Sequence, residues 1–202
     1  MEILEAINSR RSVREFLKKK ISKSVIKKLI TLASKAPSDE NSQPWEFIIV
    51  ENEKIKEQIG EISVFAGRKY FGSKKAELMK KFESLGENRS KEMVEKFITG
   101  ALFSFLKTAP ILIIAISKKD FFSCCSTSAS IENLMLAAQD FNLATCWTVI
   151  GLTNEQSLNK IKNLTEIPKD KTIIAILALG YPAKMPKPRA RKNVDEICRW
   201  IE

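Results

Sequence analysis

The sequence of 202 residues contains no histidine, and this absence removes several kinds of catalytic site. Without histidine there is no Ser-His or Cys-His pair to activate a nucleophile, and the most common general base is missing. If the chain is an enzyme, its chemistry must come from another source. A bound cofactor is the natural candidate.

Cysteine is scarce, and no two cysteines have the C-x-x-C spacing. The four are Cys124, Cys125, Cys146 and Cys198. With no histidine to complete a ligand set, we expect no zinc or iron–sulfur site. A disulfide framework is not expected in a chain of this size either. We interpret the thiols as buried and inert, while a redox role for Cys124, Cys125 and Cys146 stays an open alternative.

Long apolar runs are also missing. The longest candidates, Pro110 to Ser117 and Ile173 to Leu179, have the length of strands. A membrane helix needs roughly 20 apolar residues. The first residues lack the basic start and apolar stretch that are typical of a signal peptide. We therefore expect no membrane association and a cytoplasmic location.

The chain carries a net charge of +10, and its cations are unevenly distributed. Residues 10–35 hold ten cations and one acid, and residues 184–192 hold five cations and no acid. Two separated basic segments in an otherwise acidic chain suggest one anion site built from both. Nucleic acid is the competing explanation, but there is no long basic run and no basic motif interleaved with aromatic residues. We therefore expect no nucleic-acid partner.

The apolar periodicity predicts both helices and short strands. Helices are expected at 2–9, from an N-cap at Ser22, at 54–62, at 126–141, from a capping box at Thr153, and as a last short helix capped by Asn193. Strands are expected at 47–50, 111–116, 145–149 and 172–179. The segment 65–107 is interpreted as a helical excursion whose aromatic residues either pack together or line a pocket, with packing favoured. The prediction is a single α+β domain over residues 1–202.

Four polar motifs are candidates for a binding site. Arg10-Arg11-Ser12-Val13-Arg14 offers forked donors that match phosphate oxygens, or is a solvated basic loop. The loop from Ala36 to Trp45 presents neutral donors and acceptors that suit a polar heterocycle, or is an ordinary turn. The segment from Thr145 to Gly151 ends a strand, where free backbone N–H groups and a glycine allow a planar ring to approach, or is a buried strand end. Gly180-Tyr181-Pro182 leads into a basic tail that either reaches a phosphate or wraps the surface.

In this order and spacing the motifs resemble the nitroreductase family of flavoproteins. The resemblance runs from Met1 to about Trp200 and is weakest from Phe65 to Lys107, where the family also varies. Its most specific part is the loop of form A-P-S-x-x-N-x-Q-P-W. The stretch Ile131 to Ala138 is similar to the family's central dimer helix, in which Gln usually stands at the position of Glu132.

The resemblance implies a three-layer α+β sandwich, with a mixed, mostly antiparallel sheet flanked by helices, and an intertwined homodimer. It implies FMN as cofactor and NADH or NADPH as co-substrate. It also assigns the cofactor-binding residues. Arg10, Arg11, Ser12, Arg14, Arg189 and Arg191 would hold the phosphate and sugar chain; Pro37, Ser38, Asp39, Asn41 and Gln43 would reach the flavin from the other subunit; Thr148, Val149, Ile150 and Gly151 would run past the ring. The sequence departs from the family after Trp147, where Gly-Gly or Glu-Gly is frequent and Thr-Val-Ile-Gly stands here.

The implied function is an oxidoreductase that moves hydride from NAD(P)H through flavin to a small electron-poor acceptor, such as a nitroaromatic or a quinone, by ping-pong at one site. No side chain is expected to act as a catalytic acid or base, because the flavin carries the chemistry. Two alternatives remain: a specialised member, such as a dehalogenase or a flavin- or cobalamin-related protein, and a flavin-binding module without turnover. Neither the physiological acceptor nor the choice between NADH and NADPH follows from the sequence.

Overall fold

The computed structural model describes residues 2–202 and shows an α+β fold. The main helices are α1 (Ile3–Ser9), α2 (Lys23–Ala33), α3 (Glu53–Phe71), α4 (Lys75–Phe82), α5 (Glu87–Ile98), α6 (Phe105–Thr108), α7 (Phe121–Asp140) and α8 (Glu155–Leu164). The strands are β1 (Glu46–Val50), β2 (Ile111–Lys118), β3 (Ala144–Thr148) and β4 (Lys171–Gly180). Short 3-10 turns include η1 (Asp39–Asn41), η4 (Ile150–Leu152) and η5 (Val194–Glu196).

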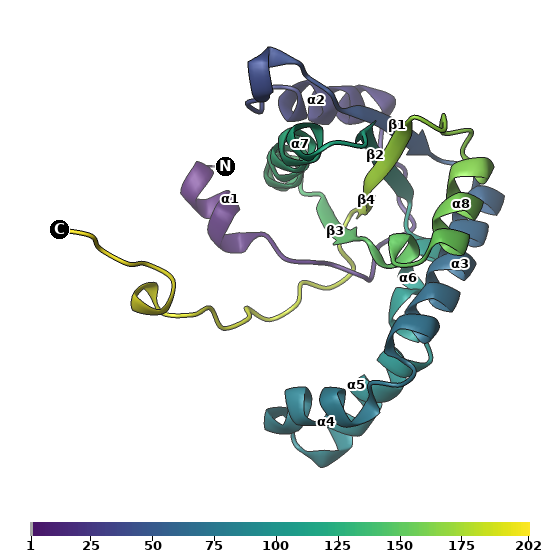
Figure 1. Ribbon diagram of the computed structural model, residues 1–202, viewed down its shortest axis with the longest axis vertical. Helices are drawn as coiled ribbons and strands as arrows, with labels where there is room; N and C mark the ends of the chain where they lie inside the picture. The colour runs from purple at the N-terminus through teal and green to yellow at the C-terminus, as the bar shows by residue number, and fades with distance from the viewer. Residues whose placement is uncertain (1) are drawn as a thin grey trace.

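The strands form one antiparallel sheet in the order β1-β2-β4-β3 (Figure 1). Side chains alternate between the two faces of a strand, so β2 supplies both sides of the core. Ile111 and Ile113 face a cluster with α2 and α7, whereas Leu112 and Ile114 face a cluster with α3, α6 and α8. The result is three layers, with helices on both faces of the sheet, as the fold class predicted from the sequence.

Strand β1 corrects one expectation. A continuous apolar run such as 47–50 suits a buried strand, but here only Val50 is buried, and Phe47, Ile48 and Ile49 are half-buried. The cause is position, because β1 is an edge strand with a single neighbour, β2. An apolar run alone does not distinguish a central strand from an edge strand.

Helix starts follow capping chemistry, with two corrections. Ser22 caps α2 as predicted, and its hydroxyl accepts the Val25 N–H at 3.4 Å. The capping box at Thr153 was wrong, since Asn154 caps α8 by accepting the Ser157 N–H at 3.0 Å. Helix α7 begins five residues before the predicted start, because Asp120 accepts the Ser123 N–H at 2.8 Å and opens the helix there.

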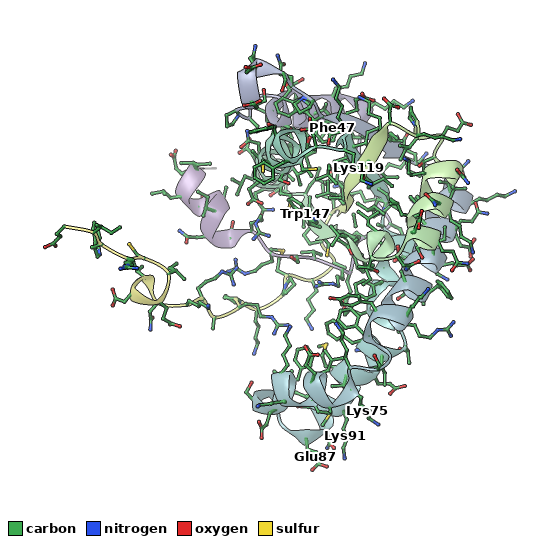
Figure 2. The ribbon with its side chains drawn as sticks, viewed as in Figure 1. Phe47, Lys75, Glu87, Lys91, Lys119 and Trp147 are labelled. Carbon is green, nitrogen blue, oxygen red and sulfur yellow. The ribbon has the colours of Figure 1, made fainter. Side chains whose placement is uncertain are left out.

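The segment between β1 and β2 is helical throughout most of its length, and α4 and α5 lie at the end farthest from the sheet (Figure 1). An ion pair between Glu87 and Lys91 lies at this tip (Figure 2). The aromatic residues pack on one another, with ring centroids 4.9 Å apart for Phe71 and Phe97 and 6.2 Å for Phe71 and Phe103. The packing interpretation of these aromatics therefore holds for this group.

Both ends of the chain extend away from the sheet on the same side (Figure 1). Helix α1 was predicted with an apolar face, yet Ile3, Leu4 and Ile7 are 60%, 70% and 53% exposed. Every residue of the tail 183–202 is exposed, and its side chains project from an extended ribbon (Figure 2). The turn after Asn193 is a single 3-10 turn and not an α-helix. Within residues 2–202 no helix is long and apolar enough to cross a membrane.

Candidate functional site

The basic segment after α1 is held by the sheet. Ser12 forms a parallel bridge with Thr145, the Val13 N–H donates to the Thr145 carbonyl at 3.0 Å, and β3 is the edge strand on that side. Farther along, the Leu17 N–H donates to the Tyr181 carbonyl at 2.9 Å. The segment therefore runs from the outer edge of β3 to the end of β4.

This anchoring brings the beginnings of the two basic segments together. The Ala183 N–H, at the start of the tail, donates to the Glu15 carbonyl at 2.9 Å, and Phe16 forms an antiparallel bridge with Pro182. Residues 10–35 and 184–192 are distant in sequence, so their proximity follows from the sheet. The sequence predicted one anion site made from both basic segments. The structure places residues 15–16 of the first segment beside residues 182–183, which lead into the second.

Burial along the segment separates anchoring residues from donors. Val13 is fully buried and Phe16 packs against the core, whereas Ser12 and Arg14 are exposed. The Arg14 guanidinium lies 5.7 Å from the centre of the Phe105 ring, and its Nη1 donates to the Ser12 carbonyl at 3.3 Å. The Phe105 ring and the Ser12 carbonyl therefore position the Arg14 side chain, which forms no ion pair with an acid among residues 2–202.

The other two arginines of the motif, Arg10 and Arg11, already contact groups of the protein. Arg10 Nε lies 3.5 Å from Glu132 Oε1 of α7, and the two side chains are 21% and 48% exposed. Arg11 Nη1 donates to the carbonyls of Asn8 and Arg10, at 2.7 and 2.8 Å. Glu132 as a partner of Arg10 was missed by sequence reasoning, because no local pattern links a residue after α1 to the middle of α7.

In the tail, Arg189 and Arg191 are exposed. Arg191 Nη1 contacts only nearby backbone carbonyls, those of Arg189 at 3.2 Å and Ala190 at 3.3 Å. Neither arginine is ion-paired within the described residues, so both keep their charge available for an anion.

The end of β3 completes this part of the site. Thr148 is buried and its hydroxyl accepts the Ile150 N–H at 3.2 Å, so that amide is already used. Val149 is 47% exposed and Ile150 is buried. A Cβ on Gly151 would lie 2.7 Å from Ile161 Cδ1 and 3.2 Å from the Ser63 hydroxyl. The space left by this glycine is thus filled by the protein core, which gives a packing reason for the glycine.

Strand β3 also contains an unused polar atom. The Thr145 hydroxyl is buried and has no hydrogen-bond partner within the described residues, although buried polar groups are nearly always paired. It sits on the residue that holds Ser12 and Val13.

The loop from Pro37 to Gln43 is a separate, preorganised unit on the N-terminal half of α7. The Asp39 N–H donates to the Ser126 hydroxyl at 3.2 Å, and the Ser38 hydroxyl accepts the Gln43 N–H at 3.1 Å. Asn41 and Gln43 adopt positive φ angles of 57° and 45°, an unusual conformation for residues with side chains. With Glu40, whose φ is 49°, three such residues lie in one short loop, which indicates a shape that its surroundings maintain.

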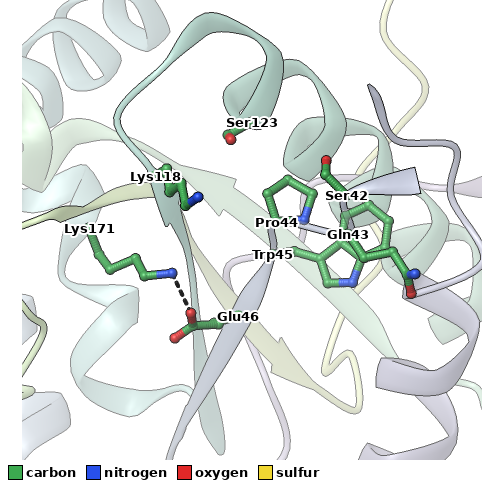
Figure 3. A pocket seen from close by; sticks show the side chains of 8 residues that line it. All are labelled: Ser42, Gln43, Pro44, Trp45, Glu46, Lys118, Ser123 and Lys171. Carbon is green, nitrogen blue, oxygen red and sulfur yellow. Dashed lines mark hydrogen bonds and ion pairs between the residues drawn. The ribbon is translucent and has the colours of Figure 1, made fainter. Parts of the chain in front are cut away.

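The loop does not meet the arginine segment within one chain, since Figure 1 shows it on the far side of α7 from the segment between α1 and α2. Of the sequence-predicted site residues, Gln43 borders a cavity of about 240 Å³. Figure 3 shows Gln43 and Trp45 on one side of this cavity and Lys118 and Lys171 on the other. Lys171 Nζ donates to Glu46 Oε1 at 2.6 Å.

The expectation of buried thiols holds for Cys146 alone, because Cys124 is half-buried and Cys125 and Cys198 are exposed. Burial raises the pKa of the Cys146 thiol, and the nearby charge of Arg14 only partly opposes that rise. Burial, followed by the Asp120 carboxylate, raises the pKa of Cys124. Both of these thiols are therefore protonated near neutral pH, whereas the thiolate is the reactive form. Among residues 2–202 no group of three or more Cys, Asp or Glu side chains could hold a metal ion.

Comparison with known proteins decides the family. The sequence matches the model of the nitroreductase family over residues 7–181, which is most of the chain. The chain belongs to the nitroreductase family. An iodotyrosine deiodinase from Thermotoga neapolitana is 28% identical over 98% of this chain and 97% of its own length.

Solved nitroreductase-family structures agree with the fold. An iodotyrosine deiodinase bound to FMN and 3-iodo-L-tyrosine is 26% identical, covers 95% of both chains and superimposes with a TM-score of 0.75. An FMN- and NADPH-dependent nitroreductase from Sphigopyxis sp. strain HMH covers 100% of both chains with a TM-score of 0.79, at 18% identity. At that identity the second likeness concerns the fold alone.

Proposed function

We propose that this nitroreductase-family chain is an FMN-dependent oxidoreductase whose flavin site lies beside the end of β3. The observation that carries the proposal is that the segment with Ser12 and Arg14 is bound between β3 and the end of β4. Its two donors therefore lie beside the start of the second basic segment. Forked guanidinium donors and a hydroxyl fit a phosphate ester. The deiodinase structure that contains FMN adds support at 26% identity.

Further donors near this segment suit the phosphate and sugar chain of the cofactor. Arg14, Arg189 and Arg191 carry no counter-ion among the described residues, and the Thr145 hydroxyl lacks a partner. We assign the phosphate and sugar chain to Arg10, Ser12, Arg14 and the two tail arginines. Bound FMN supplies the redox chemistry, with hydride arriving from NADH or NADPH and electrons leaving to a small electron-poor acceptor, such as a nitroaromatic or a quinone.

The side chains of this site bind and orient, and none is assigned as a catalytic acid or base. Arg14 holds negative charge from a fixed position above Phe105. The buried Thr148 and Ile150 form a rigid, water-poor wall, and exposed Val149 lies at the surface where a ring could rest. Preorganised groups of this kind avoid rearrangement when the ligand binds.

The proposal includes a homodimer, because one chain leaves large apolar side chains uncovered. Trp200 and Ile201 of the tail are 81% and 89% exposed, and Phe121 of α7 is 74% exposed. Large exposed apolar side chains that adjoin one another, as Trp200 and Ile201 do in the chain, are typical of interaction surfaces. A second copy would cover these side chains. It would also bring its own loop, with Ser38, Asn41 and Gln43, to complete the flavin site that one chain alone leaves incomplete.

The first test is the visible absorption spectrum of the purified protein, recorded before and after anaerobic addition of NADH or NADPH. We expect a flavin spectrum that bleaches on addition of at least one of them. A flavin spectrum that persists would retain the cofactor and favour a binding module without turnover. A colourless protein that does not take up added FMN would overturn the proposal.

Reductive dehalogenation is the second candidate, and it is favoured by the deiodinase from Thermotoga neapolitana at 28% identity over nearly the whole of both chains. The two functions separate with chemically reduced protein. Release of iodide from 3-iodo-L-tyrosine faster than reduction of a nitroaromatic would favour the dehalogenase. The opposite order would favour the general reductase.

A further inference from the structure

A large cavity lies at the edge of the sheet where β1 ends and β2 begins, and it shares no residue with the flavin site assigned above. Its volume is about 840 Å³, which is within the range of small-molecule pockets. One wall is the segment that leads into α2, and the other is the start of α3 together with the residues that precede β2.

The lining is strongly basic. Six lysines and two glutamates border the cavity, an excess of four positive charges. Lys18, Lys20 and Lys23 form no ion pair within residues 2–202. Glu53 is already paired with Lys56, at 2.9 Å between Nζ and Oε1, so Glu51 is the carboxylate left to face these three lysines. Uncompensated like charges around one hollow repel each other until an anion enters.

The wall that carries the three lysines is fixed at both ends. The Leu17 N–H is bonded to the Tyr181 carbonyl, Ile21 is 6% exposed, and Ser22 caps α2. Within this stretch, Lys19 Nζ lies 4.1 Å from the centre of the Tyr181 ring. The lysine side chains therefore extend from a backbone that is already ordered, which reduces the entropy lost when a ligand binds.

The opposite wall is rigid because of a buried lysine. Lys56 is 1% exposed, and its ammonium group donates to the carbonyls of Ala109 and Pro110 at 2.8 and 2.9 Å, in addition to Glu53. All three of its donors are used, so Lys56 maintains the wall and does not reach a ligand. Pro110, Ile111 and Ile21 add apolar surface to the lining.

We infer that this cavity binds a small organic polyanion with adjacent phosphate groups, of about the size of a nucleotide. The lysines Lys18, Lys20 and Lys23 would hold the phosphates, since an ammonium group is a point charge that suits phosphate oxygens. The apolar floor would contact the organic part, and Glu51 would accept a hydroxyl hydrogen from it. The volume and the mixed lining favour this class over a single inorganic ion.

The test is a calorimetric titration of the full-length protein, as purified with its flavin, with ADP and separately with inorganic tripolyphosphate. The variant is Lys18→Ser/Lys20→Ser/Lys23→Ser. The matched control is Lys27→Ser/Lys28→Ser/Lys35→Ser, which removes the same charge from exposed positions outside the cavity. We expect the first variant to lose affinity by about tenfold or more, as for lost hydrogen bonds to charged groups, and the control to change by less than about twofold.

The outcomes are distinguishable. Tighter binding of ADP than of tripolyphosphate supports an organic ligand, and equal loss of both in the cavity variant supports the site. Binding of tripolyphosphate alone would overturn the organic part of the inference. No binding of either probe, or equal weakening in both variants, would overturn the site itself. Unchanged melting temperature and flavin content in the variants show that folding and the flavin site are intact.

Discussion

Strand β2 and the tail 183–202 both contain large apolar side chains, but their surroundings are opposite. In β2, every residue from Ile111 to Ser117 is buried, because β1 and β4 flank the strand and helices cover both of its faces. In the tail, every residue is exposed, including Ile197 and Trp200. Apolar character alone therefore does not bury a residue, since a neighbouring surface must be present. The sheet supplies that surface within the chain, and we propose that a second chain supplies it for the tail.

The largest expected effect separates the two regions directly. Ile114→Ala in β2 should lower the free energy of unfolding by about 2–5 kcal/mol, because a fully buried side chain is removed and a cavity remains. Chemical denaturation at low protein concentration measures it. Ile201→Ala, at a position 89% exposed in the single chain, is the matched control; at concentrations where the protein is monomeric it should change the unfolding free energy by less than about 0.5 kcal/mol. Equal losses of unfolding free energy in the two variants would contradict the conclusion that β2 is buried and the tail is not.

The second prediction compares the same side chain on an anchored and an extended backbone. Arg14→Ala should weaken FMN binding by roughly tenfold to a hundredfold, since a hydrogen bond from a charged group contributes about 1.5–3 kcal/mol. Arg191→Ala should weaken it less, because the tail must first be ordered. Fluorescence titration of the apoprotein measures both. Arg89→Ala in α5 is the control, and unchanged FMN affinity in Arg14→Ala would contradict the assignment of the phosphate site.

The third prediction concerns what covers the tail. Ile197→Ser/Trp200→Ser should weaken self-association by about tenfold or more, because buried aromatic anchors dominate interface energies. Sedimentation over a range of concentrations measures the monomer–dimer equilibrium. Lys192→Ser tests a polar tail position and should leave the equilibrium nearly unchanged. A wild-type protein that is monomeric at all concentrations would show that no second chain covers the tail.

The smallest effect is expected at the contact between α7 and the anchored segment. Glu132 lies 3.5 Å from Arg10 and competes with a phosphate for that guanidinium. Glu132→Gln should therefore tighten FMN binding by up to about fivefold, since partly exposed ion pairs contribute about 0–1 kcal/mol. Equilibrium titration with FMN measures the change. Weaker binding in this variant would show that the carboxylate positions Arg10 productively.

Local structure was largely predictable because it depends on neighbours in sequence. The strand at β2, the cap at Ser22 and the helical character between β1 and β2 all follow from short-range rules. The same rules failed where two local solutions competed, as at Thr153 and Asn154, or where an earlier cap such as Asp120 lengthened a helix. The nitroreductase motifs indicated the family before any contact was known.

By itself, the sequence determined which segments become helices and strands, the absence of histidine chemistry and the family. Only the tertiary structure decided which distant residues meet. Hydrogen bonds from Val13 to Thr145 and from Ala183 to Glu15 join the two basic segments, the sheet order places β1 and β3 at its edges, and the fold carries Glu132 to Arg10. The physical reason is that backbone propensities and caps act over a few residues, whereas these contacts depend on how the sheet and helices pack across the whole chain.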